Sequence, residues 1–123
     1  MYFSFEIFVK NIVIDNTRIS YIDKGKGQII LFIHGLFFPK EGFIPLIEIL
    51  SKNYRCIALD LPGFGQSDAI YSTFSKKKYI NIINRFVNLI CKRKKIVLFG
   101  SSLGGFFSIL YAHVLSRIQF TAK

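Results

Sequence analysis

The chain has 123 residues, 51% of them hydrophobic and 16% aromatic, which is enough to bury one core and excludes a disordered segment. Its formal net charge is +10, and the excess lies in the second part: residues 1–68 hold seven basic and seven acidic side chains, residues 69–123 ten basic and none acidic. No apolar run approaches the roughly 18 residues of a membrane-spanning helix. The opening residues lack the basic start of a secretory signal, so we expect a single cytoplasmic domain over residues 1–123.

Apolar periodicity predicts alternating strands and helices. Alternation over residues 11–15 and 18–23, around a turn at Asn16 and Thr17, predicts an antiparallel hairpin. The unbroken apolar run within residues 28–34 is typical of a central strand buried on both faces of a parallel sheet. Further strands are predicted over residues 54–59 and 96–99, and helices over 43–52, 75–92 and 103–115. This order predicts an α/β fold in three α-β-α layers, with a mostly parallel sheet, an N-terminal antiparallel hairpin and flanking helices.

Two features of composition leave alternatives open. Basic side chains cluster at residues 76–78 and 92–95. Such clusters are typical of a solvated helix face; the alternative interpretation is that they contact phosphates or an anionic membrane surface. No nucleic-acid-binding module is present, so we expect no specific nucleic-acid partner. Cys56 and Cys91 lack metal-ligand spacing and are expected to be buried, reduced thiols; no metal site and no cofactor is predicted.

A serine lies at the centre of a Gly-x-Ser-x-Gly pattern formed by Gly100, Ser102 and Gly104, between an apolar strand and an apolar helix. A sharp strand-to-helix turn raises such a serine hydroxyl above the sheet and needs small residues two positions to either side. Ser102 is therefore the candidate nucleophile. A serine hydroxyl needs an activating base held by a third group, yet only 21 residues follow Ser102 and none is Asp or Glu.

Two more motifs follow predicted strands: the run from Phe32 to Leu36 (Phe-Ile-His-Gly-Leu) and the run from Asp60 to Asp68 (Asp-Leu-Pro-Gly-Phe-Gly-Gln-Ser-Asp). With the Ser102 motif, in this order, they resemble the oxyanion loop, glycine-rich loop and nucleophile elbow of the α/β-hydrolase fold superfamily. The resemblance covers roughly residues 10–115, the N-terminal half of such a domain.

The resemblance implies that Ser102 attacks a carbonyl carbon and that two backbone N–H groups stabilise the resulting oxyanion. These would be the N–H groups of Leu103 and Leu36, with Phe37 as the alternative to Leu36. It also implies four residues that organise the loops around the serine: His34, Gly35, Gly100 and Gly104.

Other polar residues are given structural interpretations. His34 is expected to order its loop rather than act as the base. His113 lies eleven residues beyond Ser102, about 16 Å along a helix, and is expected to be a partly buried helix residue out of reach of the hydroxyl. Asp60 is interpreted as a structural strand-end residue and Asp68 as a turn or cap.

The sequence departs from the family because the acid and the histidine that follow the nucleophile are absent. We therefore expect a truncated domain that is inactive alone, that takes a small ester-like substrate if a C-terminal chain completes it, and that self-associates or aggregates through an open sheet edge at residues 96–99. A non-catalytic remnant or interaction protein is the alternative, and a basic binder of anionic surfaces is a third. The motifs do not specify the substrate or the type of bond.

Overall fold

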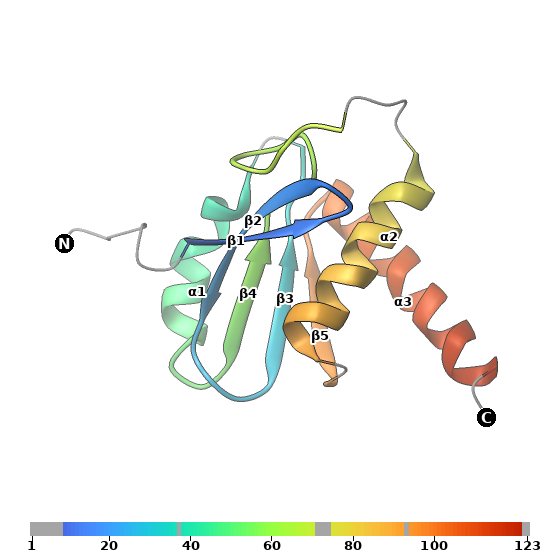
Figure 1. The fold of residues 1–123 in the computed structure, drawn as a ribbon. Helices are drawn as coiled ribbons and strands as arrows, with labels where there is room; N and C mark the ends of the chain where they lie inside the picture. Colours follow the sequence, from blue (N-terminus) through green and yellow to red (C-terminus); the bar gives the residue numbers. More distant parts are fainter. Residues whose placement is uncertain (1–8, 37, 71–74, 93, 122–123) are drawn as a thin grey trace.

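A mixed sheet of five strands forms the middle layer of the protein (Figure 1). The computed structural model describes residues 9–36, 38–70, 75–92 and 94–121. The strands are β1 (Val9–Ile14), β2 (Thr17–Lys24), β3 (Ile29–Ile33), β4 (Arg55–Leu59) and β5 (Ile96–Gly100), in the spatial order β1-β2-β4-β3-β5. β2 pairs antiparallel with β1 and β4, whereas β3 pairs parallel with β4 and β5. The predicted α/β class and the hairpin are confirmed; β3 is an internal strand, but the central position in the described sheet is that of β4.

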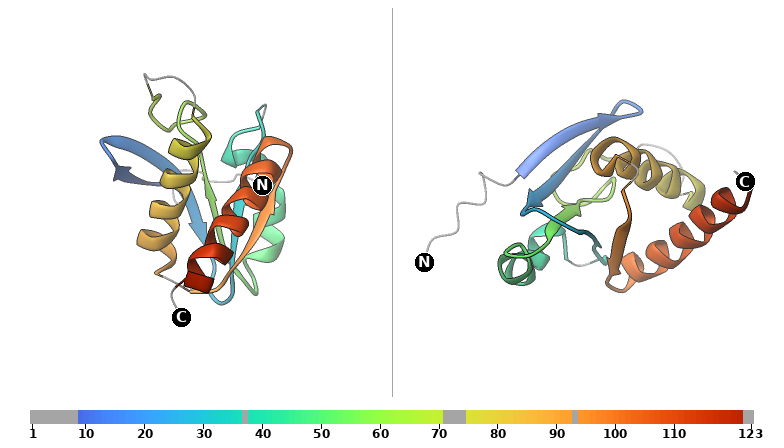
Figure 2. Two further views of the ribbon diagram at one scale, coloured as in Figure 1. Left: turned by 90° about the vertical axis from the view of Figure 1, so that its right-hand side faces the viewer. Right: turned by 90° about the horizontal axis from the view of Figure 1, so that it is seen from below.

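Helices cover both faces of this sheet (Figure 2). On one face α1 (Ile44–Leu50), which follows a 3-10 turn η2 (Lys40–Phe43), packs Ile47 in a cluster with Phe32 and Ala58. On the other face α2 (Lys76–Phe86) and α3 (Leu103–Thr121) contribute Phe86, Phe107 and other apolar residues to the larger core. Because both faces are covered, every residue of β3 is buried.

Two predicted boundaries are wrong for local backbone reasons. The hairpin turn is centred on Asp15 and Asn16, with φ of 50° and 61°, one residue earlier than expected, because Asp and Asn tolerate the left-handed conformation that such a turn needs. The helix predicted over residues 75–92 gives way after Phe86 to a π-helical turn, η3 (Val87–Cys91), which ends at Lys92 with φ of 52°. The start of α2 agrees with the prediction, since the Ser75 hydroxyl caps this helix by accepting a hydrogen bond from the Lys78 N–H at 3.3 Å.

Helix α3 continues past the predicted end at residue 115 to Thr121, because no Gly or Pro interrupts that stretch. His113 is exposed, so the expectation of partial burial is wrong: Phe107 and Tyr111 face the core and His113 lies on the outer side of the helix. Among the described residues, no helix is both long and apolar enough to cross a membrane.

Strand β5 is one edge of the sheet, as expected. Within the described part of the chain it pairs only with β3, and Val97 and Phe99 remain 51% and 45% exposed. The expectation for the cysteines is also confirmed: Cys56 and Cys91 are buried free thiols, and burial raises the pKa of Cys91 to about 11.

Candidate active site

The three sequence motifs meet at one edge of the sheet because the parallel strands end level with one another. Ile33, the last residue of β3, pairs with Leu59 at the end of β4 and with Gly100 at the end of β5. The Ser101 N–H extends this register by donating to the Ile33 carbonyl at 3.1 Å. Ligands of open α/β sheets bind outside the carboxyl ends of the strands, which is where these loops begin.

Ser102 occupies a sharp turn between β5 and α3. Its φ is 54°, a left-handed value that is uncommon for a residue other than glycine. The Gly104 N–H donates to the Ser101 carbonyl at 2.9 Å and the Phe106 N–H donates to the Ser102 carbonyl at 3.2 Å, so the chain enters the helix directly after the turn. The Ser102 residue is exposed at this point.

Close backbone approaches explain the glycines around Ser102. A Cβ atom at Gly104 would overlap the carbonyl oxygen of Ile33, and one at Gly100 would overlap the carbonyl of Gly104. A Cβ at Gly35 would lie 3.1 Å from the Ser102 Cβ, so the loop after β3 passes directly beside the serine. Small residues at these positions bring the two loops into contact.

The backbone donors expected for an oxyanion lie on these same two loops. Leu103 is the first residue of α3, where an N–H group has no partner within the helix and the helix dipole favours negative charge. Leu36 lies in the loop beside Ser102, one residue after Gly35, and is 54% exposed. Phe37, the alternative to Leu36, lies outside the described residues.

His34 is fully buried, and both of its ring nitrogens are occupied. The Leu61 N–H donates to Nε2 at 2.9 Å, which leaves the proton on Nδ1, and Nδ1 donates to the Gly35 carbonyl at 2.7 Å. The imidazole therefore links the loop after β3 to the loop after β4. Neither nitrogen is available to take a proton from Ser102.

Sequence reasoning missed a buried ionic cluster beneath the same loops. Lys40 is fully buried, and its Nζ donates to Asp60 Oδ2 at 2.6 Å, Glu41 Oε1 at 2.7 Å and Gln66 Oε1 at 3.0 Å. The Asp60 carboxylate also accepts the Lys40 and Gln66 N–H groups, whereas Glu41 Oε2 is buried without a hydrogen-bond partner. Lysine is rarely fully buried unless it is paired, and nothing in the sequence around Lys40 identifies Asp60 as its partner.

Side-chain hydrogen bonds hold the loop after β4 to the hairpin, to its own backbone and to α2. Asp68, expected to be a turn or cap, instead accepts the Arg18 N–H of β2 at 2.9 Å. The Ser67 hydroxyl donates to the Asp60 carbonyl at 2.7 Å. Tyr79 of α2 donates to the Pro62 carbonyl at 2.7 Å, and burial raises the pKa of its hydroxyl.

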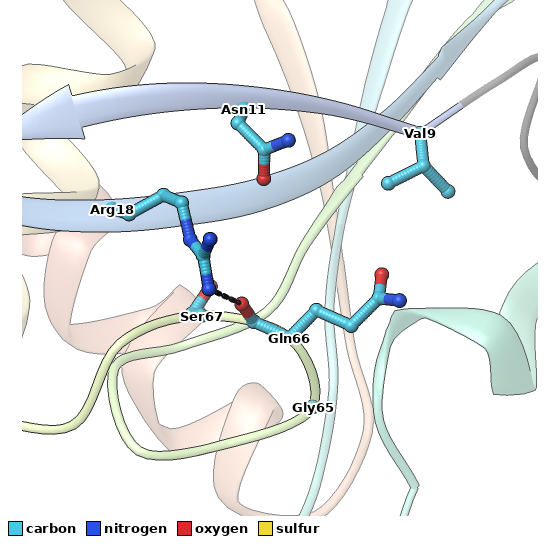
Figure 3. A pocket seen from close by; sticks show the side chains of 6 residues that line it. All are labelled: Val9, Asn11, Arg18, Gly65, Gln66 and Ser67. Atoms are coloured by element: carbon cyan, nitrogen blue, oxygen red, sulfur yellow. Dashed lines mark hydrogen bonds between the residues drawn. The ribbon is translucent and has the colours of Figure 1, made fainter.

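Two hollows lie near these loops. One of about 240 Å³ borders the serine turn and is lined by Gly35, Phe38, Gly42, Phe43 and Ser101. The other, of about 400 Å³, lies between the hairpin and the loop after β4, and there the Arg18 guanidinium donates to the Gln66 carbonyl at 3.3 Å (Figure 3). Its lining residues are Val9, Asn11, Arg18, Gly65, Gln66 and Ser67. Only the first hollow touches the neighbours of Ser102.

Comparison with known sequences identifies a matching family model and several related proteins. A sequence model of the alpha/beta hydrolase fold matches residues 28–117. The chain is 34% identical over 73 residues to an (E)-2-((N-methylformamido)methylene)succinate hydrolase of Acinetobacter baylyi, covering 58% of this chain and 28% of the relative. It is 32% identical over 88 residues to a 2-hydroxy-6-oxo-6-(2'-aminophenyl)hexa-2,4-dienoic acid hydrolase of Metapseudomonas resinovorans, covering 69% of this chain and 30% of that protein.

A solved structure agrees with these sequence relatives. The crystal structure of an E-2-(acetamidomethylene)succinate hydrolase superposes with a TM-score of 0.78 at 29% identity, covering 85% of this chain and 38% of the other. The chain thus spans about a third of the length of the proteins it matches. Since the matched region includes all three loops at the carboxyl edge of the sheet, the chain belongs to the alpha/beta hydrolase fold family.

Proposed function

We propose that this chain is the nucleophile-bearing part of a serine hydrolase that cleaves esters or related acyl compounds. The observation that carries the proposal is the backbone of Ser102: a left-handed turn at the end of β5 that sets the residue beside the Gly35 loop. Strain of this kind at a non-glycine residue is characteristic of functional sites. The names of the relatives as hydrolases support the same class of reaction.

In the proposed reaction, Ser102 Oγ forms a bond to the substrate carbonyl carbon as its O–H bond breaks and a general base takes the proton, and the carbonyl electron pair moves onto oxygen; the base later gives this proton to the leaving group. We assign the N–H groups of Leu103 and Leu36 as donors to that oxyanion. The leaving group then departs with the bonding electrons and takes up a proton, and water hydrolyses the acyl-serine. Each step moves a proton, so a general base is required.

Neither histidine of the chain fits the role of base. Both nitrogens of His34 are bonded to backbone groups, and His113 lies eleven residues along α3 from Ser102, about 16 Å at 1.5 Å per residue. We therefore propose that the base lies outside these 123 residues, and that residues 1–123 alone hydrolyse esters at a negligible rate.

Chemical rescue tests this proposal with residues 1–123 alone. Imidazole added to the solution supplies a base, and an alkyl phosphonofluoridate supplies an electrophile that stays attached: the serine O–P bond forms, the P–F bond breaks, fluoride leaves and imidazole takes the proton. We expect site-resolved mass spectrometry to find phosphonylation at Ser102, at least tenfold faster than at Ser101, with a rate that rises with imidazole concentration. Preorganised oxyanion donors alone account for about 10³-fold or more in serine proteases stripped of their triad.

Two variants control this experiment. Ser102→Ala should abolish the imidazole-dependent labelling, whereas Ser51→Ala, at the end of α1 and remote from the three loops, should leave it unchanged. Equal labelling of Ser101 and Ser102, or labelling that persists in Ser102→Ala, would show that Ser102 is not the nucleophile.

A second candidate is an interaction protein that uses the open edge of β5. The observation in its favour is the exposure of Val97 and Phe99 on a strand that pairs on one side only within the described residues. Edge strands with exposed apolar side chains are templates for added strands. This role does not require Ser102, so the labelling experiment separates the two candidates.

A further inference from the structure

The hollow of about 240 Å³ beside Ser102 is bounded by the two loops that the proposed reaction uses. Gly35 lies one residue before the proposed donor Leu36, and Ser101 lies one residue before the nucleophile. The hollow is therefore bordered by the residues that directly precede the proposed donor and the nucleophile, and the loop that carries Gly35 also passes beside the Ser102 Cβ. The remaining lining residues, Phe38, Gly42 and Phe43, come from the loop and η2 turn that follow.

Apart from Ser101, the side chains that line the hollow are apolar, and one of them is packed against the core. Phe43 packs against Phe32 at 5.1 Å and Phe99 at 6.0 Å between ring centroids, so its ring is backed by the core of the α1 face. Phe38, which also lines the hollow, is 67% exposed. The two rings offer hydrocarbon contact, and no charged side chain is among the residues that line the hollow.

The size of the hollow is limited by Gly42. Its volume of about 240 Å³ lies below the roughly 300–1,000 Å³ usual for ligand pockets, so it suits a small group rather than a whole drug-sized molecule. A Cβ atom at Gly42 would lie 3.2 Å from the Phe38 Cβ, so any side chain there would occupy the space beside the Phe38 ring. The φ of Gly42 lies outside the left-handed region, so the backbone itself tolerates a larger residue.

We infer that this hollow receives the short, unbranched apolar acyl group of the compound that Ser102 attacks, and that Gly42 sets its size limit. The inference rests on the proposed function and adds the substrate class: acyl chains of about four carbons, whose methylene groups lie between Phe38 and Phe43. Longer chains extend past the hollow into water and gain little.

The test measures the rate of Ser102 phosphonylation, in the presence of imidazole, with methyl-, butyl- and octyl-phosphonofluoridates. Burial contributes up to about fourfold in rate per methylene group, and less in a hollow that is open on one side. We therefore expect the butyl reagent to react roughly tenfold faster than the methyl reagent, and the octyl reagent to gain no more than about twofold over butyl.

Two variants locate the preference. Gly42→Leu fills the hollow and should reduce the butyl-to-methyl ratio to about one, whereas Asn53→Leu places the same side chain at an exposed position after α1 and should preserve it. Phe38→Ala removes an exposed ring and so keeps the fold; it should lower the ratio several-fold.

The outcomes separate the two proposals. Labelling of Ser102 with a ratio that neither Gly42→Leu nor Phe38→Ala changes would overturn the acyl pocket and leave the nucleophile in place. Failure of all three reagents to label Ser102 would overturn the nucleophile, and the acyl pocket with it. A ratio that falls in both variants and persists in Asn53→Leu supports both.

Discussion

Replacing Lys40 with methionine should be among the most destabilising single changes in this chain. The lysine Nζ is fully buried and lies 2.6 Å from Asp60 Oδ2 and 2.7 Å from Glu41 Oε1. Methionine keeps an unbranched side chain but removes the cation, so the buried Asp60 carboxylate is left with only the neutral donors of the Lys40 and Gln66 backbones. Breaking a buried ion pair in this way costs about 3–5 kcal/mol.

A loss of about 3–5 kcal/mol is a large fraction of the free energy of unfolding of this domain. A domain of 123 residues is stable by about 6–18 kcal/mol, at about 0.05–0.15 kcal/mol per residue. The melting temperature should fall by about 10–20 °C. Lys24→Met is the matched control, because Lys24 forms an ion pair of similar length with Glu48, 2.8 Å, whose side chains are 26% and 30% exposed. Exposed pairs contribute about 1 kcal/mol at most.

Urea denaturation followed by far-ultraviolet circular dichroism measures both free energies of unfolding. The expected result is a loss for Lys40→Met at least three times that of Lys24→Met, with unchanged dependence on urea concentration. A loss below about 1 kcal/mol for Lys40→Met, or equal losses in the two variants, would refute the view that this cluster holds the two loops together.

Three further outcomes are expected. Burial raises the pKa of Cys91 to about 11, so above pH 9 the unfolded chain releases a proton that the folded chain keeps. The free energy of unfolding, measured by urea denaturation at each pH, should therefore fall between pH 9 and 11, and it should fall less steeply in Cys91→Val. Gly104→Ala should destabilise the fold by about 1–3 kcal/mol because its Cβ overlaps a β3 carbonyl, whereas Gly105→Ala, where the nearest neighbour of the new Cβ lies at 3.5 Å, should stabilise it by up to about 1 kcal/mol. Thermal unfolding measures both changes, and stability changes of the same sign in the two variants would contradict this prediction. Self-association through the β5 edge should weaken in Val97→Lys and persist in Ile49→Lys, an exposed position on α1, when measured by light scattering after size exclusion.

The fold could be predicted from the sequence where residue type and period agree. The apolar run of β3 predicted burial on both faces, and the helices on both faces confirm it. The register of β3 with β4 and β5 then brings the motif loops to one edge. Boundaries failed where the backbone left regular geometry. Asp15 and Asn16 are residue types that favour a left-handed turn, but the apolar alternation placed the turn one residue late; at Lys92 the residue type gives no signal of its left-handed conformation.

The support beneath the candidate site could not be predicted. Lys40 follows a proline in the loop before α1, and its burial depends on Glu41 beside it and on Asp60 and Gln66 from the loop after β4. Asp60 could be placed at a strand end from the sequence, yet its partner could not. Pairing across loops is a tertiary property, and a lone lysine in such a stretch is more often solvated.

Two requirements of the proposed acyl transfer are met separately: the positioning of the serine and the transfer of its proton. The turn that carries the serine is fixed by β5, by α3 and by close approach to the β3 carbonyl, and the adjacent loop is fixed by His34 and the Lys40 cluster. None of these contacts brings a histidine to the Ser102 hydroxyl, because both ring nitrogens of His34 are hydrogen-bonded to backbone groups. In the proposed reaction, the position of Ser102 and the stabilisation of the oxyanion would therefore be preorganised by these residues, whereas proton transfer would depend on a base from elsewhere. Added imidazole should supply that base without altering the position of Ser102.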